Sequence, residues 1–321
     1  MTSPALDLVF LGTPEIAVPA LRALVAAGHR VRLVVTQPDR PAGRGRRLLR
    51  SAVAQTADEL GLTVVQPGRV AEAAGRIASI GADALVVMAF GQMLPPAVLA
   101  AGRLGAINLH TSLLPALRGA APINRAIMRG LGRTGVTTMF MDQGMDTGDI
   151  ILQQPTEIGP QDTAGQLSER LAHLGAGLLL RTLSELAQGH APRRPQDAAL
   201  ATYAPRLDKA EGLIDWSRPA RELDWLARGV DPWPGAHTLL EGLPLKLFAP
   251  TLVVDDPGAP PDTPPGTWLP PMSGREDYLL IACGRGALGL GQVQAAGKKR
   301  LPAREFQRGH KDGPGRRLGG A

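Results

Sequence analysis

Strand-like and helix-like segments alternate through the first half of the chain, and this alternation limits the possible folds more than any other feature. Short apolar runs, each typical of a buried strand, occur at 7–11, 31–35, 84–88 and 105–110. Between them the pattern predicts helices at 19–28, 51–60, 69–79 and 120–129, and a long loop at 36–47. Strands that alternate with helices form a mostly parallel sheet covered on both faces, so we predict an α/β fold.

A long amphipathic helix is predicted to close this first half. Asp162 can cap it, Gly189 can end it, and leucines recur between them at helical spacing. These leucines are Leu167, Leu171, Leu174, Leu178, Leu183 and Leu186. The polar, proline-containing stretch that follows is predicted to be a stiff linker.

Beyond residue 207 the pattern changes to one helix, at 218–229, followed by short β-like runs. These runs lie at 236–240, 244–254, 266–270, 277–282 and 287–294, and they predict a small barrel or sandwich. A chain of 321 residues is long enough for two cores. We therefore expect a first domain at 1–189, a linker at 190–206, a second domain at 207–308 and a disordered tail at 309–321.

The composition favours a globular protein of a reducing compartment. Hydrophobic residues make up 44% of the chain, which supports a buried core, and the lone Cys283 excludes an internal disulfide. No apolar run approaches the roughly 20 residues that span a bilayer, and the N-terminus lacks the pattern of a secretion signal. We expect a cytoplasmic protein without a membrane partner.

Positive charge is concentrated in two places. Five arginines and one acid lie at 39–50, and eight basic residues with two acids lie at 298–317. Two separated basic clusters suit a polyanion such as a nucleic acid that is touched at two points. The same composition also suits a solvated surface with a basic tail, and composition alone does not separate these alternatives.

The segment that begins at Asn108 holds the residues best suited to chemistry. Residues two apart in a strand point to one face, so Asn108 and His110 project together while Leu109 enters the core. Both stand at the carboxyl end of a predicted parallel strand, where open α/β sheets bind ligands. An amide donor beside an imidazole suits acyl transfer, and Asp146 could orient the imidazole. Taken singly, however, His110 also suits a structural role and Asp146 a turn.

Other chemistries lack the residues that they need. No Gly-x-Gly-x-x-Gly follows the first strand, which argues against a nucleotide-dependent dehydrogenase. Asp142, Asp146 and Asp149 do not have the alternation of a calcium loop. We expect no metal site, because the remaining histidines show no ligand spacing: His29, His173, His190, His237 and His310.

Two strings together carry a resemblance to a known family. Asn108-x-His110-x-Ser-Leu-Leu-Pro115 and Asp142-x-Gly-x-Asp146-Thr-Gly-Asp149 resemble the folate-dependent formyltransferase superfamily. Four further motifs place the chain nearest to members that act on an aminoacyl-tRNA: Gly12-Thr-Pro14, the loop 36–45, Arg118-Gly-Ala-Ala-Pro122 and Ala296-Gly-Lys-Lys299. The likeness covers nearly the whole chain, is strong up to about residue 160 and at Tyr203–Trp216, and is looser through the second domain. Thr111 and Phe90 depart from the usual residues, which leaves the folate affinity open.

The resemblance implies a fold and a set of site residues. The first domain would be a Rossmann-like formyltransferase domain and the second a β-barrel of the oligonucleotide-binding (OB) type. Asn108, His110 and Asp146 would be catalytic. The folate carrier would lie against Val87, Met88, Ala89, Phe90, Gly91, Ser112, Leu113, Leu114 and Pro115. Contacts to tRNA would come from Arg40, Arg44, Arg46, Arg47, Lys209, Lys298 and Lys299.

The implied reaction moves a formyl group from 10-formyltetrahydrofolate to the α-amine of methionine on initiator tRNA, in a monomeric enzyme without a metal. Four other functions remain to be separated from it. An amino-sugar-nucleotide formyltransferase and a folate-dependent hydrolase would share Asn108, His110 and Asp146. A tRNA-binding protein without activity would not need them, and a dehydrogenase would need the missing glycine motif.

Overall fold

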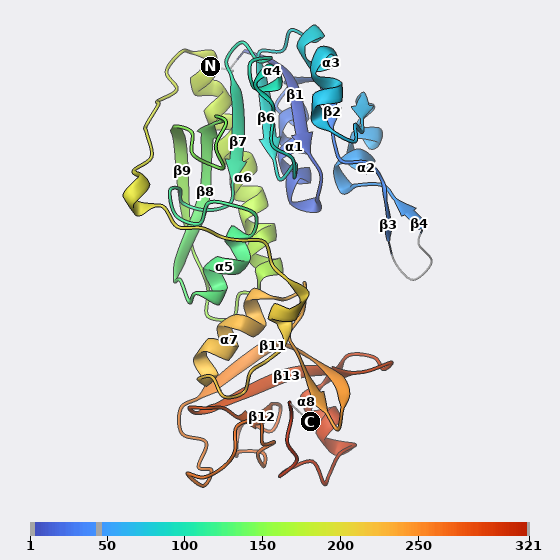
Figure 1. The fold of residues 1–321 in the computed structure, drawn as a ribbon, viewed down its shortest axis with the longest axis vertical. Helices are drawn as coiled ribbons and strands as arrows, with labels where there is room; N and C mark the ends of the chain where they lie inside the picture. The colour runs from blue at the N-terminus through green and yellow to red at the C-terminus, as the bar shows by residue number, and fades with distance from the viewer. Residues whose placement is uncertain (1–3, 43–46, 320–321) are drawn as a thin grey trace. The chain divides into compact units, whose positions relative to one another are not determined.

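The computed structural model describes residues 4–42 and 47–319, and the chain divides into two compact units (Figure 1). Unit 1 comprises Met1–Pro122, Thr134–Thr156 and Ser168–Ala204. Unit 2 comprises Ile123–Arg133, Glu157–Leu167 and Pro205–Ala321. Two short excursions from the first half therefore pack with the second half. Among the described residues, none of the helices combines the length and hydropathy required to cross a membrane.

Unit 1 is built on a seven-stranded sheet with the order β5-β2-β1-β6-β7-β8-β9. The strands are β1 Asp7–Gly12, β2 Arg30–Val35, β5 Val64–Val65, β6 Ala84–Met88, β7 Ala106–His110, β8 Arg133–Phe140 and β9 Ile150–Glu157. Pairing is parallel from β5 to β7, and β8 runs antiparallel to β7. The prediction of a mostly parallel α/β sheet is confirmed.

Short helices connect the strands of unit 1, as the alternation predicts. They are η1 Glu15–Ala17, α1 Val18–Ala26, α2 Ala52–Glu59, η2 Val70–Ala73, α3 Ala74–Ser79, α4 Pro96–Leu99 and α5 Pro122–Met128. Strand order reverses at β1, which has β2 on one side and β6 on the other. The carboxyl ends of β1 and β6 thus border the crevice in which open α/β sheets hold ligands.

The long helix α6, Ala164–Ala187, follows the predicted leucine stripe and packs on β7 and β8. A Cβ atom at Gly175 would lie 2.9 Å from the Leu109 side chain, so glycine permits the close approach of α6 to β7. Thr182 of α6 is hydrogen-bonded at 2.7 Å to Thr138 of β8. Through these contacts α6 supports β7, which carries Asn108 and His110, and the neighbouring strand β8.

The prolines and glycines of the stretch 36–47 predicted a loop, but part of this stretch forms a strand. Strand β3, Arg40–Ala42, pairs antiparallel with β4, Arg47–Leu49, in a separate two-stranded ribbon. Pro41 is compatible with this ribbon because, within the described ranges, β3 pairs with β4 alone, and an edge strand tolerates a missing N–H group. The predicted tRNA contacts Arg44 and Arg46 lie outside the described residues.

Unit 2 is built on an antiparallel sheet with the order β10-β11-β13-β12, and β14 also pairs with β13. Its elements are η4 Lys209–Gly212, α7 Ala220–Gly229, β10 His237–Leu240, β11 Leu243–Val254, β12 Leu279–Ala282, β13 Ala287–Ala295, β14 Leu301–Pro302 and α8 Ala303–Arg308. The predicted run 266–270 forms no strand and only two isolated bridges, from Thr267 to Arg317 and from Trp268 to Ile281. Prolines at both ends of this run, which cannot donate hydrogen bonds, limit its pairing.

The end of the chain differs from the predicted disordered tail over the described residues 309–319. The backbone N–H group of Trp268 donates to the Arg316 carbonyl, and the backbone N–H group of Leu318 donates to the Gly266 carbonyl. Leu318 is 2% exposed. Leu318 packs into the core of unit 2. The many glycines and arginines around it favoured the prediction of a disordered tail.

A buried polar network joins α7 to the rest of unit 2. Asp224 and Arg228, one turn apart, form an ion pair at 2.8 Å, and both are less than 10% exposed. The Thr251 hydroxyl donates to Asp224 at 2.5 Å, and Arg228 donates to the carbonyl of Asp162 at 2.9 Å. Each charge thus has several partners, as a buried ion pair requires.

Burial of Cys283 in unit 2 leads to a testable expectation. Desolvation raises the pKa of the Cys283 thiol from 9.0 to about 12. Near pH 9 the folded protein should therefore hold about 10³-fold less thiolate than the unfolded chain. We expect iodoacetamide to modify Cys283 slowly until urea is added. Since the unfolded thiol ionises first, the free energy of unfolding should also fall as the pH rises above 9.

Candidate active site

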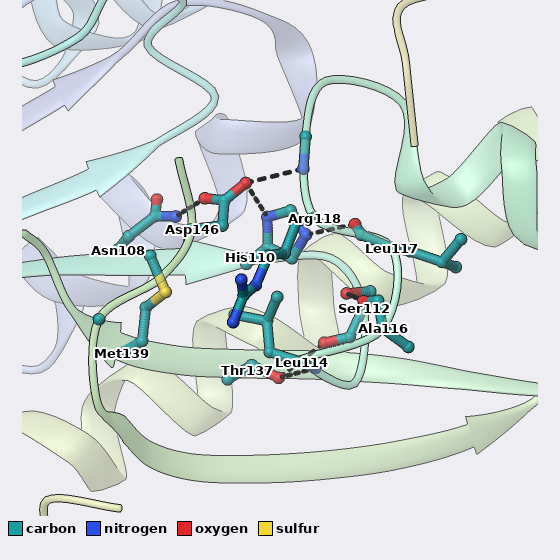
Figure 2. Close-up of polar contacts among 12 residues, drawn as sticks. Asn108, His110, Ser112, Leu114, Ala116, Leu117, Arg118, Thr137, Met139 and Asp146 are labelled. Atoms are coloured by element: carbon teal, nitrogen blue, oxygen red, sulfur yellow. Dashed lines mark hydrogen bonds and ion pairs between the residues drawn. The ribbon is translucent and has the colours of Figure 1, made fainter. Parts of the chain in front are cut away.

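Strand β7 delivers Asn108 and His110 to the same cavity, as the alternation of a strand predicts. Asn108 is 9% exposed and His110 is 7% exposed, so both side chains are largely withdrawn from water. Both line a cavity of about 500 Å³ at the carboxyl end of the sheet. Figure 2 shows their side chains on either side of the Asp146 carboxylate.

Asp146 connects the two residues. Its Oδ1 atom accepts a hydrogen bond from Asn108 Nδ2 at 3.2 Å, and its Oδ2 atom lies 3.7 Å from His110 Nδ1. The Gly119 N–H group donates to Oδ2 at 2.9 Å. Asp146 has a φ of 54°, in the left-handed region that disfavours a residue with a Cβ atom. Such backbone strain often accompanies functional sites, and here it accompanies a carboxylate with three polar neighbours.

The orientation of the imidazole is set on its other side. His110 Nε2 lies 3.0 Å from the Leu117 carbonyl oxygen, a buried acceptor. The carbonyl requires a proton on Nε2, so a neutral His110 presents its Nδ1 lone pair toward Asp146. When Nδ1 also gains a proton, the carboxylate compensates the charge of the imidazolium. The ring can therefore accept and release one proton without turning.

The predicted folate residues fall into two sets. Val87, Met88, Ala89, Phe90 and Gly91 all line the cavity. Residues 112–115 are not among its lining residues. Instead Thr137 of β8 accepts from the Leu114 N–H group and donates to the Ser112 carbonyl, at 3.2 and 2.7 Å. This second set holds the loop between His110 and Leu117 in place and does not itself line the cavity.

Two sequence motifs hold the first set in place. The Thr13 hydroxyl, at the end of β1, donates to the Phe90 carbonyl at 3.2 Å. The Gln37 amide, after β2, donates to the same carbonyl at 3.1 Å. Ala89 has a φ of 48°, so the chain turns sharply between these supports. The Gly12-Thr and Thr36-Gln motifs thus shape the wall of the cavity.

The predicted tRNA contacts are surface residues where the structure describes them. Arg40 of β3 is exposed, whereas nothing is described of the Arg47 side chain in β4. Lys209, Lys298 and Lys299 are exposed residues of unit 2. Within the described ranges, no group of three or more His, Cys, Asp or Glu side chains is arranged to hold a metal ion.

Sequence reasoning did not identify Gln196, whose side chain lies next to the site. Its amide lies between Arg118 and the backbone of the turn that carries Asp146. The stretch 190–206 is polar and proline-rich, so its pattern indicated only a linker. Its contact with a turn about 50 residues earlier has no local signal. Leu117 and Gly119 were also missed, because they contribute main-chain groups.

Comparison with known proteins agrees with the geometry. The profile of the family described as "Formyl transferase" matches residues 6–183, and that of "Formyl transferase, C-terminal domain" matches 206–311. The methionyl-tRNA formyltransferase of Citrifermentans bemidjiense is 45% identical over 97% of this chain and 96% of its own length. That of Solibacter usitatus is 47% identical over 97% and 98%.

The fold also matches a solved structure with low sequence identity. HypX from Aquifex aeolicus in complex with tetrahydrofolic acid has a TM-score of 0.65 and 15% identity, over 95% of this chain and 47% of that chain. Identity at this level shows the fold alone. The two family profiles and the full-length relatives show more: the chain belongs to the methionyl-tRNA formyltransferases of the formyl transferase family.

Proposed function

We propose that this protein transfers the formyl group of 10-formyltetrahydrofolate to the α-amine of methionine on initiator methionyl-tRNA, giving formylmethionyl-tRNA for translation initiation. The observation that carries the proposal is the placement of Asn108 and His110 on either side of Asp146 in one cavity. An amide donor, a proton carrier and a carboxylate that orients both are the groups that formyl transfer to an amine requires.

The reaction begins with attack of the neutral amine on the formyl carbon. A free α-amine has a pKa of about 7.7–8.0, so a useful neutral fraction exists near pH 7. A new C–N bond forms, and negative charge develops on the formyl oxygen in the tetrahedral intermediate. Asn108 Nδ2 carries two hydrogens, and only one is engaged by Asp146. The other can donate to the oxyanion, a contact worth about 3–4 kcal/mol.

Collapse of the intermediate breaks the bond between the formyl carbon and the folate nitrogen. The attacking nitrogen must lose a proton and the departing nitrogen must gain one, so no net proton is consumed. His110 Nδ1 is the group placed to carry this proton, a role that contributes on the order of 10²–10⁴ in rate. Asp146 holds the ring and compensates the charge of the imidazolium.

The two substrates would use different parts of the molecule. Residues 87–91 would contact the folate carrier directly, and Ser112–Pro115 would keep their loop in register. Arg40, Arg44, Arg46, Arg47, Lys209, Lys298 and Lys299 would contact tRNA phosphates. The antiparallel sheet of unit 2 would be an OB-type barrel that binds the RNA backbone. We further propose that the protein is a cytoplasmic monomer that needs no metal ion.

Replacing Arg44 by Ala is expected to raise the KM for methionyl-tRNA while leaving the KM for the folate unchanged. By the family resemblance, Arg44 corresponds to the key arginine of the basic loop, and a phosphate contact contributes mainly to affinity. Loss of one contact should also flatten the dependence of log KM on log salt by about one unit. Arg103→Ala serves as the matched control, because Arg103 pairs with Asp83 on the surface of unit 1. Equal effects of both variants would argue against a specific loop contact.

The proposed function is tested by formyl transfer from 10-formyltetrahydrofolate to charged methionyl-tRNA, with free methionine as the control acceptor. Activity of the wild type with the charged tRNA, and its loss in His110→Ala, would support the reaction, the substrate and the residue together. If methionyl-tRNA is never formylated, the proposal fails. An amino-sugar nucleotide would then be the next acceptor to test with the same three site residues.

A further inference from the structure

We propose that Gln196 is a positioning residue for the transfer step, and that it acts by holding the backbone of Asp146. This inference rests on the proposed function. Gln196 belongs to a segment that we call the strap, residues 194–204, which follows α6 and lies within unit 1. The strap contacts two loops that shape the site: the turn that contains Asp146 and Gly148, and the loop that contains Leu117, Arg118 and Gly119.

The amide of Gln196 is engaged on both sides. Its Nε2 atom donates to the carbonyls of Asp146 and Gly148, each at 2.8 Å. Its Oε1 atom accepts from Arg118 Nε at 3.1 Å and from Arg118 Nη2 at 2.8 Å. A primary amide can donate two hydrogens and accept at its oxygen, so this position suits glutamine and neither glutamate nor an apolar residue.

The turn that Gln196 holds is one that needs an external support. Asp146 adopts a left-handed backbone conformation, with a φ of 54°. Gly148 is pressed against β8, because a Cβ atom there would lie 1.8 Å from the Phe140 carbonyl oxygen. The carbonyls on either side of Thr147 converge on a single donor group. Without that group, the two carbonyls lose their common partner and the carboxylate of Asp146 can move away from Asn108 and His110.

The same strap supports the opposite loop. The backbone N–H group of Arg118 donates to the Thr202 carbonyl at 2.8 Å, and the backbone N–H group of Ala204 donates to the Arg118 carbonyl at 2.7 Å. The Leu117 N–H group donates to the Thr202 hydroxyl at 2.9 Å. Leu117 supplies the carbonyl that orients His110, and Gly119 supplies the N–H group that binds Asp146. Gln196 therefore joins the two loops through Arg118, whose side chain is buried between them.

Gln196 is not among the residues that line the cavity, so we expect it to act on the reacting atoms only through Asp146. A residue of this kind should affect kcat through the geometry of Asp146 and leave substrate binding intact. A displacement of about 1 Å at a reacting group can lower the rate about 10²-fold. We expect a loss of this size when the two donated hydrogen bonds are removed.

The experiment compares formyl transfer to charged methionyl-tRNA by the wild type, Gln196→Glu, Gln196→Met and Leu200→Gln. Glu keeps the length and the acceptors for Arg118 but removes the donors, and Met removes all polar contacts. Leu200, which is 64% exposed on the same strap, is the matched control. Gln196→Glu is then repeated in an Asp146→Asn background, with melting temperature and the two KM values measured throughout.

We expect kcat to fall about 10²-fold in both Gln196 variants, with both KM values and Leu200→Gln close to wild type. In the Asp146→Asn background, Gln196→Glu should have little further effect, because residues that act as one unit are not additive. A further fall in kcat of about 10²-fold in that background would overturn the inference. A Gln196 variant that raises KM but leaves kcat unchanged would also overturn it. Wild-type kcat in both Gln196 variants would overturn it while leaving the proposed function intact, whereas an inactive wild type would refute the function itself.

Discussion

Replacing Asp146 by Asn is expected to lower kcat by roughly 10²–10⁴ while leaving the affinity for tRNA unchanged. The carboxylate accepts from Asn108 on one oxygen and from the Gly119 N–H group on the other. An amide of the same shape must turn its NH₂ group toward one of these donors, so one contact becomes repulsive. The negative charge opposite His110 is lost as well.

Single-turnover formylation, with both substrates saturating, measures this loss at the transfer step. Glu59→Gln is the matched control, since it makes the same carboxylate-to-amide change in an exposed surface ion pair of unit 1. Filter binding of methionyl-tRNA checks that the affinity is preserved. An Asp146→Asn variant with wild-type kcat would contradict the placement of Asp146 in the transfer step, and a large loss of tRNA affinity would contradict the division of roles between the two substrates' residues.

Replacing Asp224 by Ala is expected to destabilise unit 2 by about 3–5 kcal/mol. The change removes a carboxylate that pairs with Arg228 and accepts from the Thr251 hydroxyl, and it leaves a guanidinium buried without its charge partner. Both members of the pair are nearly inaccessible to water, so the solvent cannot replace the lost interaction.

The chain supplies both a probe and a control for this measurement. All four tryptophans, Trp216, Trp225, Trp233 and Trp268, lie in unit 2, so urea unfolding followed by their fluorescence reports on that unit. Glu222→Ala breaks an exposed pair with Arg218 at the same four-residue spacing. An exposed pair contributes at most about 1 kcal/mol, so a similar loss in both variants would mean that burial of the Asp224 pair is unimportant.

Much of the fold follows from the periodicity of the sequence. The buried runs that became β1, β2, β6 and β7 contain few polar residues, and α6 has a continuous leucine stripe. Strand β8 was not predicted, because its centre contains threonines whose hydroxyls look polar in sequence. In the structure Thr137 and Thr138 are fully buried, and their hydroxyls bond to Ser112 and Thr182.

The site was predictable to the extent that its residues are neighbours in the chain. Asn108 and His110 are two apart in one strand, and their common direction follows from strand geometry alone. Asp146, 36 residues after His110, could be named from its chemistry as a residue that orients the imidazole, but only the family resemblance favoured this role over that of a turn residue. Gln196, a further 50 residues along, is joined to Asp146 by hydrogen bonds that no periodicity encodes.

The position of the strap also decides where this chain can be divided. The first family profile ends at residue 183, within α6, and Gly189 closes that helix in the sequence. A fragment cut at either point would keep every strand of the large sheet and the three residues proposed to act on the formyl group. It would nevertheless lack Gln196 and Thr202, which tie the two loops together. A catalytic fragment, or a chimera that carries a foreign RNA-binding module, should therefore retain the chain through Ala204.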